Sequence, residues 1–473
     1  MKKIYLILVM CFVSSVLFAR EMGDFVKNIK LSPLVVHFPE IQKEVLENGT
    51  EIQFLSNPEF PIVYADFHIY HGRKNLGKRP VEIVRLLEDS WEFSGSKTYP
   101  KDSFLQEFEK LGAGFSLAID YDKTSIHLSY LKKDEERIFS LLKSFWEEPN
   151  LNSEVISTMR GRITDEIKRR NDNPTQLGGR KAKEALYKNT IYGSTSQISS
   201  LEQIREEDLL SLQKEILSEK KKILLLTGDA NLQTWKSYLS RWKNYESSGQ
   251  KTSEEITSEL LAENIKNSKQ KNILVEKEVA QSFVYMTGVI PKHNDPDFYA
   301  IQVLNYIIGG GGFNSYYMRE IRNNRGLAYS AGSSADFQAD YGTINFFAMT
   351  KTESVPEVLS LMKELIEPKL IDSLKEEELT RAKVAINNQF VFLFEDSRKT
   401  LTNELRFRDH KMPKDYLLKF RENIDKVSLE DLRRVGKKYF SSSDMLVVIV
   451  GPKSLQSQLG GSFRLVQPEE ILP

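Results

Sequence analysis

The apolar and polar positions of this chain predict two kinds of element, arranged in groups. Apolar stretches typical of β-strands occur at 62–70, 125–131, 281–290 and 343–349. Amphipathic patterns typical of long helices occur at 134–147, 154–170 and 376–393. Because the strands come in pairs and runs of helices follow them, the pattern favours the α+β class over a wound parallel sheet.

The same order of elements occurs twice along the chain. The segments 139–143 (FSLLK) and 359–363 (LSLMK) each follow two strand-rich stretches, read as helical and precede a proline. Further along, 207–209 and 430–432 both read Glu-Asp-Leu, and each begins a helix that leads to an apolar strand ending at a glycine. The offset is roughly 220 residues in both cases, and two matches in the same order indicate an internal repeat.

We therefore expect two similar lobes, at 40–245 and 271–455, each with a mostly antiparallel sheet packed against helices. The length of 473 residues agrees, because it exceeds what one ordinary hydrophobic core accommodates. The intervening segment 246–270 contains few large apolar residues, so we interpret it as a linker.

The N-terminus has the pattern of an export signal. Lys2 and Lys3 precede an apolar run at 4–19, and charged sequence begins at Arg20. We expect residues 1–19 to be a signal peptide and the protein to be exported, to the periplasm where the host has two membranes. An uncleaved membrane anchor is the alternative. Cys11 is the only cysteine, so the cleaved chain would have no disulfide and no Cys-ligated metal.

Charge gives little indication of a partner. Lys+Arg and Asp+Glu are equal at 66 each, so composition predicts no general attraction to nucleic acid or anionic membranes. After residue 19 no apolar stretch is long enough to cross a membrane.

One predicted helix, at 81–93 (VEIVRLLEDSWEF), carries four charged residues on one face. Val84, Leu87 and Trp91 share the apolar face; the charged face consists of Arg85, Glu88, Asp89 and Glu92. On periodicity alone, an ordinary amphipathic helix with a solvated polar stripe is the plainest interpretation of this pattern.

A second candidate site follows the glycine run made of Gly309, Gly310, Gly311 and Gly312. A phosphate loop is excluded because no Lys-Ser/Thr pair follows and the preceding segment reads as helical. A flexible connection between helices remains possible. Further on, Arg322 is predicted to lie near a helix end closed by Gly326, with Tyr329 at the start of a strand.

Together these segments resemble the insulinase/pitrilysin peptidase family, which includes the mitochondrial processing peptidases. The resemblance covers both halves, includes Tyr99-Pro100, and implies two lobes that face each other as a clamshell. Members carry an inverted zinc motif, H-x-x-E-H, and a glutamate ligand further on. By this resemblance Arg85 and Asp89 occupy the histidine positions, Glu88 the general-base position and Glu166 the third-ligand position.

This site is degenerate on chemical grounds. Arginine stays protonated and has no lone pair for a metal, so only Asp89 and Glu166 could remain as ligands, whereas catalytic zinc usually takes three. Arg85 and Asp89, four residues apart on a helix, should instead form an ion pair. The six histidines offer no substitute cluster. We therefore predict no metal or other cofactor in this chain, and no catalysis by Glu88 alone.

For the second half, the resemblance implies that Arg322, Tyr329 and the four glycines bind substrate. The chain is then expected to pair with a zinc-bearing homologous subunit, which would supply the zinc, and to act on peptides. Two alternatives stay open. One is a non-enzymatic binding or assembly protein derived from the peptidase fold, and the other is an active metallopeptidase with an atypical metal site.

Overall fold

The computed structural model describes residues 38–243, 245, 253–267 and 271–472. The predicted signal segment 1–19 lies outside these residues, and so does part of the predicted linker 246–270. In the part of the chain that is described, no helix is long and apolar enough to cross a membrane.

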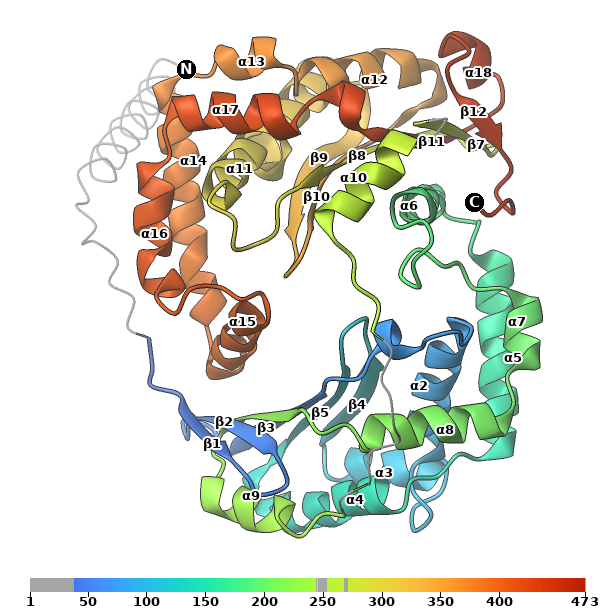
Figure 1. The fold of residues 1–473 in the computed structure, drawn as a ribbon, viewed down its shortest axis with the longest axis vertical. Helices are drawn as coiled ribbons and strands as arrows, with labels where there is room; N and C mark the ends of the chain where they lie inside the picture. Colours follow the sequence, from blue (N-terminus) through green and yellow to red (C-terminus); the bar gives the residue numbers. More distant parts are fainter. Residues whose placement is uncertain (1–37, 244, 246–252, 268–270, 473) are drawn as a thin grey trace, which may run out of the picture. The chain divides into compact units, whose positions relative to one another are not determined.

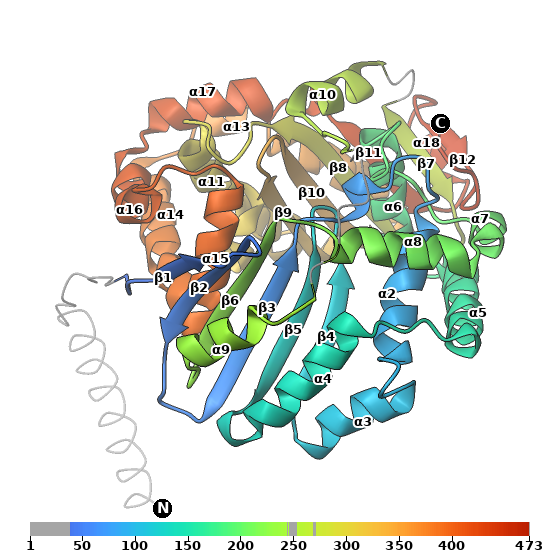
Figure 2. The same ribbon diagram turned by 60° about the horizontal axis from the view of Figure 1, so that its bottom comes forward.

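Two six-stranded sheets form the framework (Figures 1 and 2), with strand orders β1-β2-β6-β3-β5-β4 and β12-β7-β11-β8-β10-β9. The strands of the first sheet are β1 (Gln42–Val45), β2 (Thr50–Ser56), β3 (Ile62–Ile69), β4 (Gly114–Ile119), β5 (Thr124–Leu131) and β6 (Lys222–Gly228). Those of the second are β7 (Asn272–Glu276), β8 (Gln281–Ile290), β9 (Ala328–Phe337), β10 (Gly342–Lys351), β11 (Leu446–Gly451) and β12 (Arg464–Val466).

The second sheet repeats the pairing of the first. In the first sheet β2 runs parallel to β6, and β6 pairs antiparallel with β3. In the second sheet β7 runs parallel to β11, and β11 pairs antiparallel with β8. The next strands, β5 with β4 and β10 with β9, continue antiparallel to the edge. Only the opposite edges differ, because β1 is antiparallel to its neighbour and β12 is parallel. The predicted α+β class with two similar, mostly antiparallel lobes is thereby confirmed.

Helices pack against each sheet. In the first half they are α2 (Glu82–Ser94), α3 (Asp102–Lys110), α4 (Glu135–Glu147), α5 (Ser153–Arg169), α6 (Pro174–Leu186), α7 (Ile198–Gln203), α8 (Glu206–Leu217) and α9 (Leu232–Leu239). In the second they are α10 (Ser258–Asn267), α11 (Phe298–Asn305), α12 (Val355–Glu364), α13 (Pro368–Asp372), α14 (Glu376–Gln389), α15 (Ser397–Asp409), α16 (Tyr416–Lys426), α17 (Leu429–Tyr439) and α18 (Leu455–Gln458). The repeated pentapeptides lie in α4 and α12, and the repeated Glu-Asp-Leu segments begin α8 and α17.

Local sequence explains where several helices begin. Asn152 and Asn173 precede α5 and α6, and each side chain accepts hydrogen bonds from two backbone N–H groups of the first turn. Pro174 then occupies the first helical position of α6, where no N–H is needed. The described part of the predicted linker is also partly helical: α10 packs against α6 and β8, with Leu261 fully buried.

Each half of the sequence contributes one helix to the sheet of the other half. α6 packs on β8 and β11, so that Leu177 and Leu186 share a core with Phe283. Conversely, α15 packs on β2 and β6, where Leu401 and Leu405 join the first sheet. Apart from β12 (Arg464–Val466), which lies beyond the predicted end at 455, the strands fall within the predicted lobes, whereas α6 and α15 each pack on the sheet of the other half.

The packing of α6 leads to a prediction about two adjacent glycines. A Cβ at Gly178 would lie 2.6 Å from Phe283 Cδ1, whereas a Cβ at Gly179 would meet nothing within 4 Å. We expect Gly178→Ala to destabilise the protein by about 1–3 kcal/mol, because the helix must shift off β8. Gly179→Ala should be neutral or stabilising by up to about 1 kcal/mol, through helix propensity. Urea unfolding measures both; equal effects would contradict this packing.

Candidate functional site

The degenerate motif lies on α2, and its arginine is paired within the same helix. Arg85 Nε is 3.1 Å from Asp89 Oδ2, and Arg85 Nη1 is 3.1 Å from Glu88 Oε1. The predicted ion pair between Arg85 and Asp89 is therefore confirmed. The predicted apolar face of this helix is also confirmed, because Val84, Leu87 and Trp91 are at most 1% exposed.

Glu88 is engaged on its other side as well. Its Oε2 accepts a hydrogen bond from Ile119 N at 2.7 Å, and Glu92 one turn later accepts from Leu117 N at 2.9 Å. Both donors belong to β4, the edge strand, which lies beside α2 in Figure 2. Burial raises the pKa of Glu88, and the Ile119 amide and Arg85 only partly offset it. The Glu88 carboxylate thus accepts from the backbone of β4 and pairs with Arg85, so neither of its oxygens is free to act as a general base.

Glu166 lies on α5, which packs against α2. Its carboxylate pairs with Arg162 Nε at 3.3 Å, and half of both side chains is exposed. Burial raises the pKa of Asp89; Arg85 and Arg162 oppose that rise, and the negative charge of Glu166 adds to it. The structure therefore brings the three positions singled out by the resemblance, Arg85, Asp89 and Glu166, into one region.

These residues do not fit a catalytic zinc ion. Arg85 holds a positive charge against Asp89 and Glu88, where a cation would have to bind. Among the residues that the structure describes, no group of three or more His, Cys, Asp or Glu side chains could hold a metal. Three of the described histidines pair elsewhere: His68 Nδ1 lies 2.9 Å from Ser125 Oγ, and His293 Nδ1 lies 2.8 Å from His410 Nδ1.

A cavity of about 520 Å³ opens beside this region, and both Arg85 and Glu166 line it. Its wall is rich in cations: Arg73, Arg85, Arg170, Arg180 and Lys183. Sequence analysis did not single out Arg73, Arg170, Arg180 or Lys183. They belong to no motif, and they come from three places in the chain, a 3-10 turn with Arg73, the end of α5 with Arg170, and α6 with the other two, so only the tertiary structure reveals that they converge.

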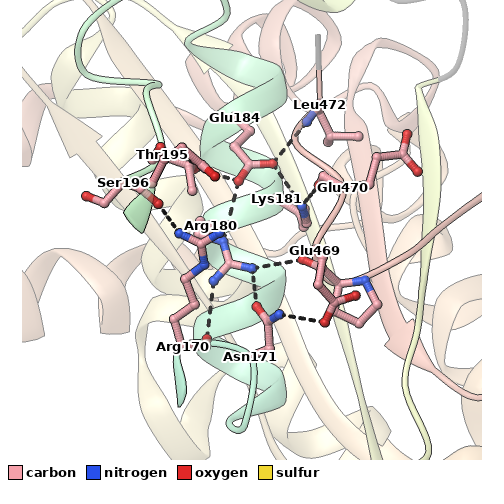
Figure 3. Close-up of polar contacts among 12 residues, drawn as sticks. Arg170, Asn171, Arg180, Lys181, Glu184, Thr195, Ser196, Glu469, Glu470 and Leu472 are labelled. Atoms are coloured by element: carbon pink, nitrogen blue, oxygen red, sulfur yellow. Dashed lines mark hydrogen bonds and ion pairs between the residues drawn. The ribbon is translucent and has the colours of Figure 1, made fainter. Parts of the chain in front are cut away.

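Part of this wall is held by a polar network around α6 (Figure 3). Glu184 accepts from Thr195 Oγ1 at 2.6 Å and from Leu472 N at 3.2 Å, and it pairs with Lys181 at 3.1 Å. Arg180 pairs with Glu184 and donates to the carbonyl oxygen of Arg170. The network ties the helix to the C-terminal residues and so fixes the side chains that α6 directs into the cavity.

The glycine run in the second half is partly helical: Gly309 and Gly310 end a π-helix, Gly311 forms a turn and Gly312 begins a short 3-10 turn. α11 continues into the π-helix Tyr306–Gly310, a 3-10 turn at Gly312–Asn314 and a second π-helix, Met318–Asn323. A Cβ at Gly309 would lie 2.4 Å from Ser333 Oγ, and one at Gly311 would lie 2.7 Å from Tyr306 O. These glycines therefore allow a close approach to β9 and a tight helical path.

Arg322 and Tyr329 lie together beyond the second π-helix. As predicted, Gly326, at φ +64°, closes the helix end through a 2.9 Å hydrogen bond from its N–H to Arg322 O, and Tyr329 lies at the start of β9, as its second residue. The Arg322 guanidinium lies 5.4 Å from the ring centres of Phe313 and Tyr329, which are 66% and 73% exposed. Neither the guanidinium nor the Tyr329 hydroxyl forms a hydrogen bond with another described residue. Phe313, from the glycine-rich segment, was not singled out by sequence analysis.

The two similar lobes and the altered inverted motif define a peptidase-like protein whose metal site is degenerate. Two family models match: Insulinase (Peptidase family M16) over residues 87–197 and Peptidase M16 inactive domain over residues 203–386. The chain belongs to the insulinase-like M16 family, as a homologue that has lost its zinc motif.

Similar proteins span most of the chain. An uncharacterized zinc protease of Rickettsia felis is 25% identical over 433 residues, 87% of this chain and 97% of its own length. The Non-peptidase homolog YmxG of Helicobacter pylori is 20% identical over 414 residues, 85% and 94% of the two chains. Among solved structures, a peptidase M16 inactive domain from Pseudomonas fluorescens superimposes with a TM-score of 0.74 at 18% identity, covering 88% of this chain and 99% of that one. The periplasmic protease PqqL from Escherichia coli superimposes with a TM-score of 0.70 at 14% identity, covering 90% of this chain and 48% of that one.

Proposed function

We propose that this protein is the substrate-clamping subunit of a heteromeric peptidase, and that a zinc-bearing homologue supplies the metal. In this arrangement Arg322 and Tyr329 hold peptide carbonyl groups and donate hydrogen bonds to the oxyanion that forms during cleavage. The glycine-rich segment 309–312 positions Phe313 and Arg322 at the same surface.

The observation that supports this proposal most directly is the contrast between the two candidate sites. The carboxylate of Glu88 is occupied on both sides, by Arg85 and by the edge of β4. Arg322 and Tyr329, in contrast, present donors without an internal partner among the described residues, on an exposed aromatic surface. Unused donors at a defined surface are what a binding role requires.

We further propose that the protein acts in the periplasm. The apolar run at 4–19, with its preceding lysines, supports export. The likeness to PqqL, described as periplasmic, is compatible with the same compartment. Mass spectrometry of the mature protein should show the loss of roughly 19 residues, and an intact N-terminus on a cytosolic protein would contradict export.

A non-enzymatic binding or assembly role is the second candidate. The name of one relative, Non-peptidase homolog YmxG, favours it. The two candidates differ in one measurable way: only the clamping subunit should change the turnover of a zinc-bearing homologue.

Reconstitution tests the proposal. The chain purified alone should contain far less than one zinc per molecule by elemental analysis and should cleave no peptide, because Arg85 excludes a cation from the motif. Mixing it with a zinc-bearing homologue from the same genome should produce peptide cleavage that neither chain shows alone. Stoichiometric zinc in the isolated chain, lost in Glu166→Ala, would instead establish the atypical metal site.

A further inference from the structure

Two cations, Arg73 and Lys183, line the cavity beside the degenerate motif without a direct ion pair; the charge of Arg73 acts on Glu88, which already pairs with Arg85. Neither Arg73 nor Lys183 forms an ion pair with any residue that the structure describes. Lys183 lies with its ammonium 3.9 Å over the ring of Tyr192, and the Nε of Arg73 is buried without a hydrogen-bond partner. Both groups line the same cavity.

Burial, together with the positive charge of Arg73, lowers the pKa of Lys183 to about 8. Two like charges in a partly desolvated site repel each other, and each loses hydration. A bound anion between them would offset both effects. The fold nevertheless holds them in place, which is typical of a site prepared for an anionic ligand.

Backbone geometry fixes Arg73. Its N–H donates to Asp120 O at 2.9 Å, and the preceding Gly72 approaches the neighbouring loop so closely that a Cβ would lie 2.5 Å from Tyr121 O. Lys183 lies on α6, and the hydrogen bonds of Glu184 to Thr195 and Leu472 hold this helix in place (Figure 3). The two cations are therefore preorganised by separate elements.

Each of the other charged side chains of the cavity forms an ion pair or a hydrogen bond, and two of them, Glu82 and Glu166, are anionic. Arg85 pairs with Asp89, Arg180 with Glu184, and Glu166 with Arg162. Arg170 donates to Ser196 O, and the carboxylate of Glu82 accepts from Gln197 N.

The rest of the lining consists of the hydroxyl residues Ser194, Thr195 and Ser196, the ring of Tyr192, and an apolar part. Ile163, Ile167 and Ile191 contribute side chains to it, together with Val81. A cavity of about 520 Å³ falls within the roughly 300–1,000 Å³ typical of small-ligand sites. A ligand that satisfies both parts of the lining has an anionic head and an apolar body.

We propose that this cavity binds a carboxylate joined to an apolar group, as at the C-terminus of a peptide, with Arg73 and Lys183 contacting the carboxylate. A guanidinium offers a planar fork of donors and an ammonium a point charge, and both form strong charge-assisted hydrogen bonds to carboxylate oxygens. This inference deepens the proposed function, because it names the part of a peptide that the subunit would recognise. A small organic acid carries the same chemistry, and the experiment separates the two sources.

The test uses the purified full chain without any partner. An N-acetylated peptide that ends in leucine is titrated calorimetrically as the free acid and as the C-terminal amide, and N-acetyl-leucine is titrated separately. We expect the free acid to bind at least about tenfold more tightly than the amide. Arg73→Gln and Lys183→Met should each remove most of this difference. N-acetyl-leucine binding as tightly as the peptide acid would assign the site to small acids.

Lys78→Ala is the matched control, because it removes the same charge from an exposed position that does not line the cavity. Arg73→Lys and Lys183→Arg keep the charge and should retain part of the preference, which separates loss of binding from loss of folding. Equal binding of acid and amide, or an unchanged preference in Arg73→Gln and Lys183→Met, would overturn the proposal. Since no cleavage is measured, this outcome is independent of whether a zinc-bearing partner exists.

Discussion

Replacing Arg322 with alanine should lower peptide turnover by the reconstituted pair about 10²–10³-fold, while folding and partner binding stay intact. The size follows from the role: one donor aimed at a developing oxyanion typically contributes about 2.7–4 kcal/mol to the transition state. The Arg322 guanidinium has no hydrogen bond to another described residue, so removing this side chain should not disturb the fold. The measurement is steady-state turnover of the complex, with complex formation checked by gel filtration.

Two further variants sharpen this prediction. Arg319 lies in the same π-helix but pairs with Glu320 and stacks on Tyr316, so Arg319→Ala is a matched control that should leave turnover nearly unchanged. Tyr329→Phe keeps the ring beside Arg322 and removes only the hydroxyl, so turnover should fall with little change in KM. Full turnover in the Arg322→Ala complex would favour the assembly role instead.

The internal repeat of the sequence predicted the two similar lobes of the fold. The two pentapeptides and the two Glu-Asp-Leu helices lie at equivalent places, and the strands they accompany have equivalent neighbours in the two sheets. The exchange of α6 and α15 was not predictable, because an amphipathic helix has the same pattern whichever sheet it covers. α10 was missed because its polar composition resembles that of a linker.

At the candidate site, sequence predicted contacts within one element and missed those between elements. The pairing of Arg85 with Asp89 follows from helical spacing alone. The hydrogen bond from Ile119 N to Glu88 depends on how α2 lies along β4, which no local pattern specifies. The glycine run was left open as a flexible connection between helices, because the glycines alone do not reveal that Gly309 packs closely against β9.

We expect Glu184→Gln, in the polar network around α6, to lower the free energy of unfolding more than any other substitution proposed for this protein. Lys181 and Glu184 are 1% and 2% exposed, and the carboxylate also receives hydrogen bonds from Thr195 and the backbone N–H of Leu472 (Figure 3). Removing one member of a buried ion pair leaves an uncompensated charge and typically costs about 3–5 kcal/mol. Glu469→Gln is the matched control: Glu469 is exposed, and among the described residues its carboxylate accepts a hydrogen bond from Asn171 alone, so its loss should change stability by less than about 0.5 kcal/mol.

The pH dependence of the Glu184→Gln variant identifies the cause. Burial lowers the pKa of Lys181 below its ordinary value, and in the native protein Glu184 partly restores it. Without Glu184 the folded-state pKa must fall further, while the unfolded value stays near 10.5. Between those two values the unfolded chain binds more protons than the folded one, so stability rises with pH in that window. Urea unfolding at several pH values should therefore show the stability deficit of the variant shrinking as the pH rises through this window.

The double variant Lys181→Met/Glu184→Leu, which removes both charges, should recover much of the lost stability at neutral pH. A deficit independent of pH and unchanged in the double variant would mean that lost packing, not the buried ammonium, destabilises the protein.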